Sequence, residues 1–78
     1  MLMTKKNRED KFVELAEKRV KNALNSLRLI KNLANKSNYS YTERDGNKIY
    51  RALLEEVRSV REAFKSGGKD SIEDFRLR

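Results

Sequence analysis

The stretch FVELAEKRVKNALNSLRLIKNLA, residues 12–34, decides the fold of this chain. Its apolar residues recur at steps of three and four, which is the period of an amphipathic helix. Neither glycine nor proline interrupts the chain between Asn7 and Lys36. We therefore predict a helix over residues 7–36.

Within that helix, a set of apolar residues alternates strictly by three and four positions, as in a coiled-coil heptad repeat. This seam consists of Val13, Ala16, Val20, Ala23, Leu27, Ile30 and Ala34. Two of its early members are alanine, so a partner helix could approach closely there.

We predict an oligomer interface made of seam residues and one residue of the second predicted helix: Val13, Ala16, Val20, Ala23, Leu27, Ile30 and Phe64.

A second helical pattern follows, and we predict a helix over residues 43–66. Its apolar stripe is Ile49, Leu53, Val57, Val60 and Phe64, widened by Ala52, Leu54 and Ala63. Thr42 and Asp45 have the spacing of a capping box, which favours a start after Thr42. The alternative makes Asp45 and Gly46 a turn, with the helix starting near Asn47. Glycine at 67 and 68 predicts the end of the helix.

The predicted fold is all-α and a single domain: an antiparallel two-helix hairpin with a connector at 37–42 and a tail at 67–78. Ile72, Phe75 and Leu77 give the tail one short apolar face, so we expect a brief helix that folds back or docks on a neighbouring subunit. A chain of 78 residues buries only about 60% of the surface that its unfolded form exposes, so its core is marginally stable alone. This chain has no cysteine for disulfides and no histidine for zinc. We therefore expect self-association, most simply as a homodimeric four-helix bundle.

The charge is unevenly distributed along the chain. Nineteen Lys and Arg oppose twelve Asp and Glu, for a net charge of +7, and no acidic residue lies between Glu17 and Glu43. Lys, Arg and Asn gather there on one polar side of the first predicted helix, where they can bond phosphate oxygens or base edges. Lys21, Arg28 and Lys31 are the predicted central phosphate contacts. The plainer interpretation is a solvated outer face.

Tyr39 and Tyr41 lie in the connector, beside basic residues. They either cover the open end of the hairpin core, with one of them buried, or stack on bases. We favour the structural role, and we expect Tyr39 to be the better placed for stacking. The complete predicted nucleic-acid site is Lys18, Lys21, Asn25, Arg28, Lys31, Asn32, Asn35, Lys36 and Tyr39.

The composition argues against catalysis. Without histidine or cysteine the chain lacks the usual general base and thiol nucleophile, and it has no glycine-rich phosphate loop. A group of acids at Glu9, Asp10, Glu14 and Glu17 is more typical of a solvated face than of a cation site. We expect no enzyme, cofactor or metal. No signal-peptide core or apolar run of membrane-span length occurs, so we expect no membrane partner and a cytoplasmic location.

Three segments, FVELAEKRV (12–20), LRLIKNLANKSNYSYT (27–42) and KIYRALLEEV (48–57), resemble a group of small bacterial and mobile-element helical proteins. The group shares an Arg-Leu-Ile…Asn-Leu…Asn…Ser…Tyr-x-Tyr-Thr pattern and has no established activity. The resemblance covers residues 12–64 and implies a bacterial or mobile-element origin and a helical hairpin, but no mechanism. Gly46 departs from the pattern.

Two functional hypotheses follow. The first is a non-enzymatic, nucleic-acid-associated accessory or regulatory protein of a bacterium, plasmid or phage. The alternative is a protein–protein interaction module, such as an inhibitor or assembly factor for a larger complex, for example in host defence. Membrane-surface binding fits less well, because the basic side has no Trp or Phe beside it to insert.

Overall fold

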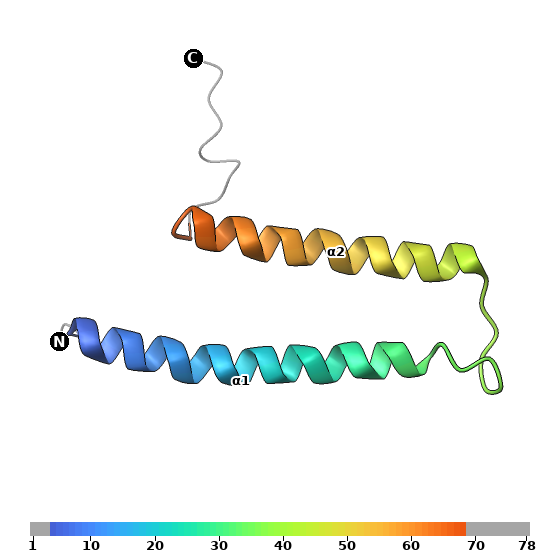
Figure 1. The fold of residues 1–78 in the computed structure, drawn as a ribbon, viewed down its shortest axis with the longest axis horizontal. Coiled ribbons are helices and arrows are strands. Elements are labelled where there is room, and N and C mark those ends of the chain that lie inside the picture. Colours follow the sequence, from blue (N-terminus) through green and yellow to red (C-terminus); the bar gives the residue numbers. More distant parts are fainter. Residues whose placement is uncertain (1–3, 69–78) are drawn as a thin grey trace, which may run out of the picture. The chain divides into compact units, whose positions relative to one another are not determined.

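The computed structural model describes residues 4–68. Their regular structure is entirely helical, with α1 at Lys5–Asn32 and α2 at Glu43–Lys65 (Figure 1). The chain divides between Ser40 and Tyr41 into two units, one carrying each helix. The all-α prediction is confirmed. The tail predicted to carry Ile72, Phe75 and Leu77 lies outside the described residues.

Helix α1 begins two residues earlier than the apolar pattern indicates. The Thr4 hydroxyl accepts a hydrogen bond from the Asn7 amide at 3.1 Å, and the Thr4 carbonyl accepts one from the Arg8 amide at 3.0 Å. Threonine is a favourable N-cap because its side chain satisfies an amide that has no partner within the helix. The sequence pattern missed this start because Lys5 and Lys6 occupy the first turn, where positive charge opposes the helix dipole.

Helix α1 ends at Asn32, so the prediction of a helix to residue 36 is wrong. The amides of Leu33 and Ala34 bond to carbonyls three residues back, Ile30 and Lys31, both at 3.0 Å, which tightens the last turn. The Asn35 side-chain oxygen then accepts a bond from the Ser37 amide at 2.9 Å. Asparagine offers the backbone this alternative to helical bonding, and the connector therefore spans residues 33–42.

Helix α2 begins with the predicted capping box. The Thr42 hydroxyl accepts a bond from the Asp45 amide at 3.1 Å, and the Asp45 carboxylate accepts one from the Thr42 amide at 3.0 Å. Glu43 and Asp45 place negative charge at the positive end of the helix dipole. The start after Thr42 is confirmed, and the alternative start near Asn47 is wrong.

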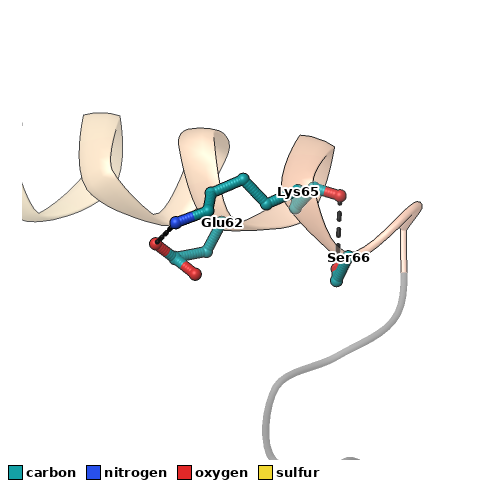
Figure 2. A network of polar contacts seen from close by, with 4 residues as sticks. Glu62, Lys65 and Ser66 are labelled. Atoms are coloured by element: carbon teal, nitrogen blue, oxygen red, sulfur yellow. Dashed lines mark hydrogen bonds and ion pairs between the residues drawn. The ribbon is translucent and has the colours of Figure 1, made fainter.

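Helix α2 ends at the predicted glycine pair. Gly67 and Gly68 have φ angles of 72° and 93°, and the Gly68 amide donates to the Ala63 carbonyl at 2.8 Å, as in a Schellman motif. Figure 2 shows the last turn, where Lys65 Nζ lies 3.8 Å from Glu62 Oε2 and the Ser66 hydroxyl donates to the Ala63 carbonyl at 3.2 Å. Lys65 is favourable here because it faces the negative end of the helix dipole.

The two positions Gly46 and Gly67 should respond oppositely to alanine. Gly46 lies inside α2, and a methyl group added to it would meet open space, so Gly46→Ala should stabilise the protein by about 1 kcal/mol. Gly67 has a left-handed backbone, so Gly67→Ala should destabilise it by about 1 kcal/mol. Chemical denaturation at one fixed protein concentration measures both. Equal effects of the two changes would contradict this assignment of α2.

No side chain among residues 4–68 is buried. Large apolar side chains lie exposed along both helices and at the cap of α1: Phe12, Val13, Val20, Leu24, Leu27, Leu29, Leu33, Ile49, Tyr50, Val57, Val60 and Phe64. Most of the stability of a helix in a protein comes from covering its apolar face rather than from helix propensity. Antiparallel pairing of the helices and self-association remain predictions.

Candidate nucleic-acid interface

The basic residues of α1 lie on one side of the helix. Because an α-helix turns by about 100° per residue, five of the predicted contacts fall within an arc of about 80°. We call this group the α1 ridge: Lys18, Lys21, Asn25, Arg28 and Asn32. All five side chains are exposed. The ridge thus offers three positive charges and two amides along one accessible surface.

Two members of the α1 ridge bond to each other. The Arg28 guanidinium donates to Asn25 Oδ1 at 2.7 Å, between residues one turn apart. This bond holds the Arg28 side chain along the ridge. A guanidinium carries five N–H donors in a planar fork, so Arg28 keeps donors for the two oxygens of a phosphate.

Four predicted site residues lie off the α1 ridge. Asn35, Lys36 and Tyr39 follow the end of α1, and the Asn35 side-chain oxygen is already used by the Ser37 amide. Lys31 is inside α1, but it is rotated by about 100° from Asn32. It therefore lies at the border of the seam rather than among the other basic residues.

The same side of α1 is acidic in its first half. Asp10, Glu14 and Glu17 precede the α1 ridge at steps of four and three residues, so they share its side of the helix. A shallow surface hollow is lined by Asp10, Val13, Glu14, Glu17, Lys18 and Lys21. This side of α1 is therefore acidic in its N-terminal half and basic in its C-terminal half. Sequence reasoning treated the two groups separately, although the spacing of residues 10, 14, 17 and 21 indicates a common side.

The two connector tyrosines differ in exposure. Tyr39 is 50% exposed, and Tyr41 is half-buried. Burial of one of them at the end of a hairpin core stays a prediction. The Tyr39 amide donates to the Asn35 carbonyl at 3.0 Å, which ties its backbone to the turn after α1.

Metal-binding clusters and membrane-spanning helices are both missing from the part of the chain that the structure describes. No three acidic side chains between residues 4 and 68 converge into a group that could hold a metal ion. Neither α1 nor α2 is long and apolar enough to cross a membrane.

No protein-family model, curated protein or solved structure matches this chain. The α1 ridge and the exposed apolar faces are therefore the observations from which function is argued.

Proposed function

We propose that this protein is a small, basic, non-enzymatic helical protein that binds nucleic acid through the α1 ridge. An accessory or regulatory role in a bacterium, plasmid or phage fits this activity. The observation that carries the proposal is the ridge itself: Lys18, Lys21 and Arg28 are exposed on one side of α1, and no acidic residue follows Glu17 in that helix.

The chemistry of the ridge suits a phosphate backbone. Lysine acts as a point charge towards phosphate, whereas arginine can bind two phosphate oxygens at once. Asn25 and Asn32 add amide groups that can bond phosphate oxygens or the edge of adenine. Backbone contacts would dominate, so we propose binding with little sequence preference.

The scaffold that we propose is a hairpin of α1 and α2 that self-associates through its apolar faces into a helical bundle. Its support is the exposed apolar surface of both helices, which a single copy leaves in water. A two-fold dimer would present the α1 ridge twice, and two linked contact surfaces raise the avidity for one strand without new contacts.

Direct binding tests this function. At 50 mM salt we expect the purified protein to bind labelled duplex DNA, single-stranded DNA or RNA with a Kd on the order of 1 μM or tighter. The triple variant Lys18→Gln, Lys21→Gln, Arg28→Gln should weaken binding at least roughly tenfold, because it removes three phosphate contacts. The matched control changes Arg51, Arg58 and Lys65 of α2 to Gln, with the same loss of charge.

Two outcomes would refute the proposal. One is a folded parent protein that binds none of the three nucleic acids at 50 mM salt. The other is an equal loss of affinity in the ridge variant and the α2 control, because net charge rather than the α1 ridge would then explain binding.

A protein-interaction module is the second candidate, for example an inhibitor or assembly factor for a larger complex. Leu29 favours it: this side chain is 69% exposed and lies close to the α1 ridge, well away from the seam. Co-purification from the native host after nuclease treatment separates the two functions. A retained protein partner supports the module, and loss of all bound material supports nucleic-acid binding.

A further inference from the structure

We propose that α1 pairs in antiparallel orientation with α1 of a second copy, with Val13 of each chain level with Ile30 of the other. This inference rests on the self-association in the proposed function and specifies its interface. The three features that carry it are the side-chain sizes along the seam, the charges beside the seam and a surface hollow at one end.

The side-chain sizes in the seam match in this register. An antiparallel pair places Leu27 of one copy against Ala16 of the second copy, and Val20 against Ala23 of the second copy. Large residues then face small ones, which is how helix cores fill space evenly. A parallel pair would instead put Ala16 on Ala16 and Ala23 on Ala23, between layers of paired valine and paired leucine.

The charges beside the seam favour the same orientation. Asp10, Glu17, Leu24 and Lys31 recur every seven residues along one border of the seam. Residues at such border positions pair across a coiled coil and set the orientation of its helices. In the antiparallel register, Asp10 faces Lys31 of the second copy, and this occurs at both ends. In a parallel pair, Lys31 would lie level with Lys31 of the second copy, out of reach of Asp10, so this pairing would be lost.

A surface hollow on α1 lies beside this contact. The shallow hollow lined by Asp10, Val13, Glu14, Glu17, Lys18 and Lys21 begins at the level where Ile30 and Lys31 of the second copy would lie. At this end it offers the Val13 side chain to an isoleucine and the Asp10 carboxylate to a lysine. Lys31, which lies off the α1 ridge, thereby gains a role as a contact to the second copy.

This pairing is compatible with nucleic-acid binding. Lys18, Asn25 and Asn32 lie on the side of α1 opposite the seam, so a second helix on the seam leaves them accessible. Lys31, by contrast, becomes a protein contact rather than the central phosphate contact expected from sequence.

Single cysteines test the orientation cleanly, because the chain has none of its own. We would prepare Val13→Cys and Ile30→Cys, one carrying a mass tag, and mix them in a glutathione redox buffer without nucleic acid. We expect the mixed disulfide dimer to exceed either self-dimer by at least roughly tenfold. In the antiparallel pair, the two Val13 positions are 17 residues apart along the helix, about 25 Å, which is beyond disulfide reach.

Each other outcome overturns the proposal. Efficient self-dimers of Val13→Cys would show a parallel pair, and no disulfide above that of an exposed Leu29→Cys control would show that the seam is not the interface. Sedimentation of the cysteine-free parent as a monomer would remove the dimer itself. The binding measurements on the α1 ridge are made separately, so the interface and the nucleic-acid function can fail independently.

Discussion

Leu27→Asp is expected to abolish most of the helical signal of this protein at micromolar concentration. Leu27 lies at the centre of the seam, and it is 38% exposed in the single chain. Truncating a buried leucine to alanine costs about 2–5 kcal/mol, and a carboxylate at the same position adds an unpaired charge. A domain has about 5–15 kcal/mol of stability in total, and a homodimer carries the change twice.

The loss should extend to both helices, because neither has a buried side chain among the described residues to hold it alone. Circular dichroism at 222 nm measures the helical signal, and sedimentation at the same concentration measures the mass. The matched control is Leu29→Asp, the same chemical change two residues away. Leu29 is 69% exposed and lies about 160° from Leu27 around α1, so the control should keep the helical signal of the parent.

The seam would be excluded as a buried face if Leu27→Asp kept both the helicity and the mass of the parent protein. Equal losses in the two variants would point instead to a general intolerance of α1 to added negative charge.

Salt should weaken nucleic-acid binding by about a thousandfold between 50 and 200 mM. If Lys18, Lys21 and Arg28 of both copies neutralise phosphates, about six counterions leave duplex DNA, and log affinity falls against log salt with a slope near −5. Arg28→Gln removes one contact from each copy, so its slope should be shallower by about 2. Fluorescence anisotropy titrations at four salt concentrations measure these slopes.

Arg58→Gln is the control for this measurement, since it removes the same charge from exposed surface on α2. Its slope should equal that of the parent. A parent affinity that changes little with salt would exclude phosphate contacts as the source of binding, and equal slopes for Arg28→Gln and the parent would place those contacts away from the α1 ridge.

Local signals in the sequence predicted the start and end of α2 well. The capping box at Thr42 and Asp45 and the glycine pair at 67 and 68 each act within a few residues, so neither needs the rest of the fold. The ends of α1 were predicted less well. Leu33 and Ala34 continue the apolar period, and the turn that ends the helix comes from an Asn35 side chain whose bond to Ser37 competes with helical bonding.

The candidate site shows the same division. Counting three or four residues per turn placed Lys18, Lys21, Asn25, Arg28 and Asn32 on one side of a helix, and α1 contains all five. The same counting placed Asn35 on that side and Lys36 near its edge, but α1 ends before both of them. Lys31 was included for its charge, in a stretch without acidic residues. A run of basic residues does not say towards which side of the helix each side chain points. The position of each residue around the helix, and the residue at which the helix ends, decide which side chains share a surface.

The sequence by itself determined that the chain forms two amphipathic helices. The apolar spacing, the Thr42 capping box and the glycine pair that ends α2 each depend only on residues close together in the sequence. Only the three-dimensional structure decided that α1 ends at Asn32 and that Asn35, Lys36 and Tyr39 therefore do not continue its polar side. The physical reason is that the end of a helix depends on hydrogen bonds that compete for the same backbone groups, here those of Leu33, Ala34 and Asn35.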